Sequence, residues 1–357
     1  MSTGQRILRA LLVFVPVALY LGATQAPPAW VFVVGCLAIL PLAGLMGEAT
    51  EHLAHRTGPA VGGLLNASFG NAAELIIAFM ALRAGEYEIV KASLTGSIIG
   101  NILMVLGLAM LLGGWTRKEL SFNRLAAESG SSVMVLAAVA LVIPAIYAQT
   151  TEHQHPEHIA SISLDIAWVL LATYAASLVF SLKSHKALFA PVGPNAATDL
   201  GDHGVVWSVT KSLVALLGAA VLVALVSEML VHAIGAAGEA MGLRKVFMGV
   251  VVLALVGNAA EHSTAILVAR KGKMDLALGI ALGSSMQIAL FVAPVLVIAG
   301  HWMGRPLSLE FTILEVVAVL LSVGAATLLI QDGKTNWFEG FQLLAIYAIL
   351  AITFYFI

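Results

Sequence analysis

Charged side chains are scarce in this chain: Asp, Glu, Lys and Arg make up 11% of its 357 residues, whereas hydrophobic residues make up 60%. Soluble globular domains do not have this composition, which indicates a polytopic membrane protein. The net charge of −2 leaves no basic surface, so nucleic acid is not an expected partner. Cys36 is the only cysteine and stands in an apolar run, which excludes a disulfide framework and a thiol metal site.

Long apolar runs, by contrast, are abundant. Runs of roughly 20 residues can cross a bilayer as helices. The sequence therefore predicts an all-α membrane protein of about eleven spans, near residues 7–24, 29–55, 60–83, 87–114, 123–147, 161–183, 206–234, 240–269, 274–300, 307–330 and 337–357. The first run has the flanks of a signal peptide, but a second follows almost at once, so we expect a retained helix.

An internal repeat organises these spans. A shift of 187 residues places Gly70-Asn71-Ala72-Ala73-Glu74 on Gly257-Asn258-Ala259-Ala260-Glu261, and Gly96-Ser97 on Gly283-Ser284. Each copy holds about five spans, and because that number is odd the second copy must be inserted upside down. We therefore predict a leading helix over 1–28, a first repeat over 29–183, a cytoplasmic linker over 184–205 and an inverted repeat over 206–357.

The basic residues predict the orientation of the chain. With the N-terminus in the cytoplasm, 13 of the 18 Lys and Arg residues fall on the cytoplasmic side. The five on the opposite side are Arg83, Lys91, Arg244, Lys245 and Arg305. Since basic loops stay inside, we expect a multi-pass protein of the cell (inner) membrane with a cytoplasmic N-terminus.

The two repeated motifs carry the strongest functional signal. Glu74 and Glu261 each stand within an apolar run, where a carboxylate costs about 2.5–3.5 kcal/mol on insertion scales and is a functional-site hypothesis. Asn71 and Asn258 precede these acids by three residues and share their helix face. The four side chains are thus predicted to converge at the interface of the repeats. The alternative is that the acids merely bond neighbouring helices, although polar packing in membranes normally uses Ser, Thr or Asn.

The expected ligand is a hard cation. Gly70 and Gly257 permit a break in the helix, which would add backbone carbonyls to the carboxylate and amide oxygens. Ca²⁺ accepts six to eight such oxygens in loose geometry, whereas Mg²⁺ demands a tight octahedron. Ca²⁺ therefore fits best, with Mn²⁺ and Na⁺ left open.

Other polar residues allow two interpretations. Ser97 and Asn101, and in the second copy Ser284 and Gln287, would either support the site or bond across a close helix contact. Two Gly-x-x-x-Gly pairs support the second interpretation, because this spacing lets helices pack closely. They are Gly96 with Gly100 and Gly279 with Gly283.

Three titratable residues complete the candidates. Glu51 and Glu228 lie near helix ends on opposite sides, where a gate or a proton path would be, unless they are solvated interfacial acids. His262 follows Glu261 directly and is either a proton relay or a bonded core histidine.

At these motifs the chain resembles the cation/Ca²⁺ exchangers, and in particular their Ca²⁺/H⁺ antiporter (CAX) branch. The likeness lies in Gly70–Glu74, Gly257–His262, Gly96–Asn101, Gly283–Gln287 and Thr50-Glu51. The resemblance implies an inverted five-plus-five repeat with a leading helix, and central Ca²⁺ ligation by Glu74 and Glu261. The Na⁺/Ca²⁺ branch usually has a Thr-Ser-x-Pro-Glu type element where this chain has Asn-Ala-Ala-Glu, which favours protons as the counter-ion. Branch members often have an acidic stretch where residues 184–205 have only Asp199 and Asp202.

The predicted function is therefore exchange of cytoplasmic Ca²⁺ for H⁺. Burial and mutual repulsion favour protonation of two neighbouring carboxylates, so one Ca²⁺ or two protons neutralises the pair and the two ions compete. The alternatives are a Na⁺- or K⁺-coupled exchanger, a passive cation channel, or an intramembrane metallohydrolase. The last would need a His-Glu-x-x-His element, which the residues around His52 and His55 do not provide. We expect no enzyme activity and no cofactor; a homo-oligomer is left open.

Overall fold

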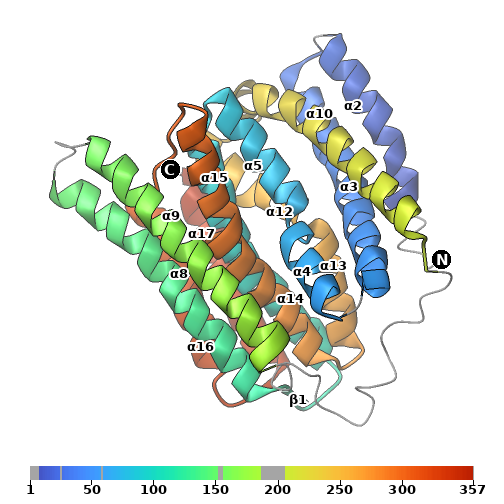
Figure 1. Ribbon diagram of the computed structural model, residues 1–357, viewed down its shortest axis with the longest axis vertical. Coiled ribbons are helices and arrows are strands. Elements are labelled where there is room, and N and C mark those ends of the chain that lie inside the picture. The colour runs from blue at the N-terminus through green and yellow to red at the C-terminus, as the bar shows by residue number, and fades with distance from the viewer. Residues whose placement is uncertain (1–7, 25, 58, 152–155, 186–205, 357) are drawn as a thin grey trace. The chain divides into compact units, whose positions relative to one another are not determined.

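The computed structural model describes residues 8–24, 26–57, 59–151, 156–185 and 206–356. Helices dominate this part of the chain (Figure 1), as the apolar runs predict. Of the predicted linker 184–205, only Ser184 and His185 belong to the described residues.

The first half of the chain contains helices of very different lengths. They are η1 (Leu11–Val13), α2 (Phe14–Ala23), α3 (Pro28–Thr57), α4 (Pro59–Phe69), α5 (Ala72–Ala84), α6 (Tyr87–Ile99), η2 (Gly100–Val105), α7 (Leu106–Gly114), α8 (Arg124–Thr150), α9 (Pro156–Val179) and η3 (Phe180–Ser184). The second half continues with α10 (Val209–Met241), α11 (Lys245–Phe247), η5 (Met248–Leu253), α12 (Ala254–Gly257), α13 (Ala259–Arg270), α14 (Met274–Gln287), η6 (Ile288–Val292), α15 (Ala293–Trp302), α16 (Ile313–Leu329) and α17 (Trp337–Phe356).

Fewer helices than predicted are long and apolar enough to cross a membrane. Seven qualify among the described residues, and a bent pair, Lys245–Gly257 with Ala259–Arg270, is an eighth candidate. Two predicted spans correspond to shorter apolar helices, Leu8–Ala23 and Ile313–Leu329. The predicted span 60–83 is divided between α4 and α5 because the chain leaves the helix at Gly70 and Asn71. The predicted count of eleven is therefore not confirmed.

The chain divides into two compact units that cut across the sequence repeat. Unit 1 comprises Met1–Gly96, Val206–Ala260 and Thr353–Ile357, and unit 2 comprises Ser97–Val205 and Glu261–Ile352. Each unit thus draws on corresponding parts of both repeats. The predicted boundaries at residues 28, 183 and 205 stay a prediction.

Unit 1 is built on the pairing of its two longest helices, α3 and α10, which lie side by side (Figure 1). Their contact is close because Gly35 of α3 faces Leu230 of α10, where an added Cβ would be 3.4 Å from the leucine side chain. Helices α5 and α12, which carry parts of the two motifs, contact α3 in the same unit.

Unit 2 contains α8, α9 and α14 to α17, with α8 and α9 running alongside each other (Figure 1). Its strands β1 (Leu120–Ser121) and β2 (Lys334–Thr335) pair antiparallel, with Leu120 opposite Thr335. Both lie in short polar loops, so they do not alter the all-α class.

Two acids within predicted spans have structural partners in unit 2. Thr312 and Glu315 form a capping box at the start of α16, in which the Glu315 carboxylate accepts from the Thr312 backbone N–H at 3.0 Å. Glu128 pairs with Arg124 one turn earlier at 2.7 Å. These acids therefore belong to helix ends rather than to the functional site.

Wide π-helical turns interrupt the helices of unit 2 at corresponding places. η2 begins directly before Asn101, and η6 directly follows Gln287, and a shift of 187 residues superimposes most of the two turns. Such turns are uncommon and often occur at functional sites. They therefore draw attention to the polar residues beside them.

Candidate functional site

In unit 1 the first motif forms a break between two helices. α4 ends at Phe69, and α5 begins at Ala72 with Asn71 as its capping residue. Glycine and asparagine are poor helix formers, which accounts for the interruption of an otherwise apolar run. Asn71 is buried, and Glu74 occupies the first turn of α5. A carboxylate in the first turn of a helix is stabilised by the helix dipole.

The Glu74 side chain lies against the second motif, within the same unit. A Cβ built on Gly257 would be 3.3 Å from both Cγ and Oε1 of Glu74. Gly257 is the last residue of α12, and it is not among the glycines with positive φ in the described chain. We predicted that glycine is needed here for its conformational freedom. The structure gives a different reason, namely the close approach of the Glu74 side chain.

The second motif repeats the interruption. α12 stops at Gly257 and α13 starts at Ala259, so only Asn258 separates them. The Asn258 side chain is buried and its Nδ2 donates to the carbonyl of Ala254 at 3.0 Å. The amide group therefore closes the end of α12.

In unit 2 three polar side chains form a chain of hydrogen bonds. Nδ2 of Asn101 donates to Oγ of Ser284 at 2.9 Å, and the Ser284 side chain is also bonded to the Glu261 carboxylate. A serine hydroxyl carries one proton and two lone pairs, so it can accept from Asn101 and bond to Glu261 at the same time. Asn101 and Ser284 are both buried.

Two buried polar atoms next to this chain of hydrogen bonds remain unsatisfied. Oε2 of Glu261 and Nε2 of His262 have no hydrogen-bond partner within the described part of the protein. Buried polar atoms normally have a partner, and exceptions require a reason. An unpartnered carboxylate oxygen of this kind is able to receive a proton or a cation.

The glycines beside these polar residues test whether the helices pack closely there. At Gly96 an added Cβ would collide with the backbone of Val250, so close helix packing is confirmed there. At Gly100, Gly279 and Gly283 it would meet nothing within 4 Å among the described residues, so the expected close packing is not found at these three glycines. Ser97 is buried in α6, and Gln287 is half-buried at the end of α14.

The two candidate gate residues lie in different surroundings of unit 1. Glu51 of α3 is exposed. Glu228 of α10 forms an ion pair with Arg83 at 3.8 Å, and the two side chains are 46% and 60% exposed. The sequence did not suggest Arg83 as a partner; it lies in the last turn of α5, which packs directly against α10.

A further polar cluster near α3 was not predicted. Glu48 lies 3.6 Å from Arg9 and 3.9 Å from the ring of His52. The His52 ring stacks on Trp207 at 4.7 Å between centroids, and Nζ of Lys211 lies 4.2 Å above the same indole. In the sequence, only Trp207, an aromatic residue at the start of the second repeat, could have pointed to this cluster.

Full-length relatives of this chain are known. The Ca²⁺/H⁺ antiporter of Aphanothece halophytica is 45% identical over 376 residues, which cover 100% of this chain and 98% of that protein. The Ca²⁺/H⁺ antiporter ChaA of Bacillus subtilis is 42% identical and covers 96% of each chain.

Solved structures show the same fold. The structure of native YfkE matches with a TM-score of 0.85 and 38% identity, covering 98% of this chain and 100% of that one. The H⁺/Ca²⁺ exchanger CAX matches with a TM-score of 0.72 at 16% identity, covering 99% and 93%, a likeness of fold alone.

The family model described as sodium/calcium exchanger protein matches residues 27–183 and 211–356, which together make up most of the chain. With the apolar helices described above, the match makes this chain an integral, multi-pass membrane protein. The chain belongs to the sodium/calcium exchanger protein family.

Proposed function

We propose that this protein is a secondary transporter that exchanges cytoplasmic Ca²⁺ for H⁺, and not an enzyme. The names of its full-length relatives support the choice of ions. The observation that carries the proposal is the contact of Glu74 with Gly257. It brings the carboxylate of the first motif to the glycine that opens the second motif, four residues before Glu261.

The proposed site joins both motifs. Glu74 and Glu261 supply carboxylate oxygens, and Asn71 and Asn258 supply amide oxygens. Ser284 and Asn101 orient the Glu261 carboxylate, while Ser97, Gln287 and His262 lie nearby as supporting groups. Oxygen ligands of this kind suit Ca²⁺, the ion that tolerates an irregular coordination shell.

Exchange follows from competition between the two ions. Two carboxylates in one desolvated site cannot both remain charged and empty, so the site holds either one Ca²⁺ or two protons. If only the neutralised forms change access, inward movement of protons drives Ca²⁺ out. The helix breaks at Gly70 and Gly257 belong to the discontinuous helices that transporters of this kind use near the middle of the bilayer.

The proposed setting is the inner membrane with the N-terminus in the cytoplasm. The uneven distribution of the 18 basic residues supports this orientation, and the membrane is suggested by the relatives from bacteria. Glu228 then lies on the outer side and Glu51 on the cytoplasmic side, where each serves as an entry residue.

A Na⁺-coupled exchanger is the second candidate because the family model itself is described as a sodium/calcium exchanger. Purified protein in liposomes separates the two. The liposomes are loaded with acidic buffer, and radioactive Ca²⁺ is added to the more alkaline medium outside. The outward movement of protons should then drive uptake of Ca²⁺ with no Na⁺ present. Uptake that requires a Na⁺ gradient, and ignores the pH gradient, would overturn proton coupling.

A further inference from the structure

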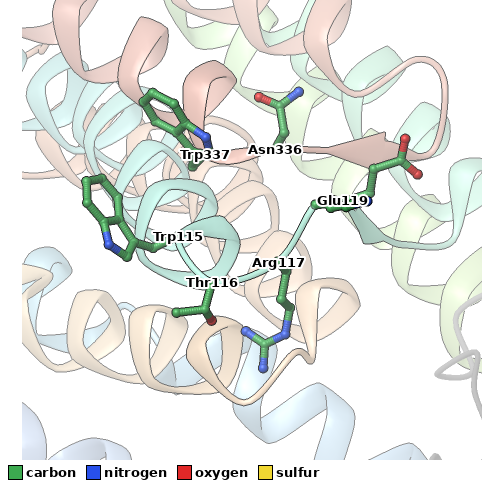
Figure 2. Close-up of a pocket in the computed structure, with 7 residues that line it drawn as sticks. Trp115, Thr116, Arg117, Glu119, Asn336 and Trp337 are labelled. Carbon is green, nitrogen blue, oxygen red and sulfur yellow. The ribbon is translucent and has the colours of Figure 1, made fainter.

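A hollow of about 580 Å³ opens in unit 2 where α7 ends and α17 begins (Figure 2). The helix that ends at Gly114 and the helix that starts at Trp337 are both candidate membrane spans. The hollow therefore lies at the level where spans leave the hydrocarbon and meet water. It is formed by two tryptophans, residues 116–119 and Asn336.

The two indoles form one wall of the hollow. Trp115 is 68% and Trp337 43% exposed, and their rings meet edge to face with centroids 5.8 Å apart. Both side chains are drawn on the same side in Figure 2. Tryptophan is enriched at the membrane interface because its ring has an apolar body and a polar N–H. Exposed indoles at a span end therefore indicate contact with lipid headgroups.

The charge of the hollow is positive once its ion pair is considered. Glu119 is paired with Lys334 at 3.0 Å, and this hydrogen bond, together with the charge of Glu119, raises the pKa of Lys334 above its usual range. Arg117 donates to the carbonyls of Gly113 at 2.8 Å and Arg270 at 3.1 Å, and it forms no ion pair with an acid of the described residues. Lys118 is exposed and forms no ion pair within the described residues. Among the residues that line the hollow, Arg117 and Lys118 are therefore the two charges without a paired acid.

The two other acids near this loop, Asp332 and Glu339, do not line the hollow. Oδ1 of Asn336 accepts from the backbone N–H groups of Phe338 at 3.0 Å and Glu339 at 3.2 Å. Its Nδ2 donates to the carboxylate of Glu339, in the first turn of α17, at 2.9 Å. Asp332 accepts from the Lys334 backbone N–H at 2.9 Å, within the loop before β2.

We propose that this hollow binds the headgroup of an anionic phospholipid. Lys118 contacts the phosphate, with the fixed charge of Arg117 and the hydroxyl of Thr116 beside it. Trp115 and Trp337 cover the region between the headgroup and the acyl chains. A basic pocket between membrane helices suits such a headgroup, and the exposed indole wall favours a lipid over a soluble anion. The proposal is independent of the transported ions.

The test uses the purified full chain in neutral detergent, titrated with phosphatidylglycerol whose acyl chains are brominated, so that bound lipid quenches tryptophan fluorescence. Lys118→Gln should raise the phosphatidylglycerol concentration for half-quenching about fivefold, since one basic residue near anionic lipid has this effect. Lys183→Gln, which removes an exposed lysine of the same unit outside the hollow, should leave it unchanged. Trp115→Phe should remove part of the quenching.

Four results would overturn the proposal. The first is equal half-quenching concentrations for the Lys118 and Lys183 variants, which would indicate diffuse charge. The second is equal quenching by brominated phosphatidylcholine. Displacement of the lipid by millimolar inorganic phosphate would assign the hollow to a soluble anion. Quenching that falls as the protein concentration rises would assign it to contact between copies of the chain.

Discussion

Glu74 and Gly257 are in direct contact, since a Cβ on Gly257 would be only 3.3 Å from Cγ and Oε1 of Glu74. Gly257→Ala should therefore displace the carboxylate by a few tenths of an ångström and lower Ca²⁺ uptake by at least tenfold, while the protein still folds. Uptake into proteoliposomes measures the effect. Gly279→Ala in α14 is the matched control, because an added Cβ there meets nothing within 4 Å. Equal activity of the two variants would contradict a functional role for this contact.

The hydrogen bonds from Asn101 to Ser284 and on to Glu261 predict coupled effects. Asn101→Ala and Ser284→Ala should each raise the Ca²⁺ concentration for half-maximal uptake. The double variant should be little worse than the stronger single one, because contacting residues couple by about 0.5–3 kcal/mol. Ser285→Ala is the control, since that buried hydroxyl donates to the carbonyl of Ala281 at 2.9 Å, within its own helix. Strictly additive losses would show that the three residues do not act as a unit.

The ion pair of Arg83 with Glu228 should matter for access rather than for folding. Both side chains are largely exposed, so breaking the pair should change the free energy of unfolding by less than about 1 kcal/mol. If Glu228 admits protons, Glu228→Gln should slow uptake at a given pH gradient, whereas Arg83→Gln, which leaves the carboxylate intact, should not. The reverse order of the two rates would exclude Glu228 as an entry residue.

The capping box at Thr312 predicts a loss of stability without a loss of specific activity. Thr312→Ala leaves the Glu315 backbone N–H without the acceptor it now has at 3.3 Å. A lost cap costs about 0.5–2 kcal/mol, which should lower the midpoint of thermal unfolding in detergent. Thr173→Ala is the control, because the Thr173 hydroxyl bonds back to the Val169 carbonyl within one helix and caps nothing. Equal midpoints for the two variants would contradict the role of the cap.

Much of the fold follows from the sequence because a membrane restricts the chain to helices whose apolar runs are visible in the residue order. The motif glycines and asparagines likewise indicated where a span is interrupted, as at Asn71 and Asn258. The number of complete spans could not be derived in this way. Whether α4 and α5 make one crossing depends on how a broken segment packs, and this is not encoded in its hydropathy.

For the candidate site too, the sequence predicts the residue types but not the contacts between them. The type of residue made Glu74, Glu261 and their asparagines the candidates, since an acid in an apolar run demands an explanation. Spacing alone did not show that Asn101 bonds to Ser284, nor that Arg83 pairs with Glu228, because these residues are far apart in the sequence and meet only through packing. Gly257 was chosen for its backbone freedom, whereas the structure shows that the Glu74 side chain approaches it closely.

The central claim is that Glu74 and Glu261 together bind either Ca²⁺ or protons. The most direct measurement is Ca²⁺ uptake driven by a pH gradient in proteoliposomes, compared for wild type, Glu74→Gln, Glu261→Gln and the control Glu128→Gln, whose acid pairs with Arg124 at a helix start. We predict that each of the first two variants abolishes proton-driven uptake while Glu128→Gln retains it. Wild-type uptake by either Glu74→Gln or Glu261→Gln would contradict the account.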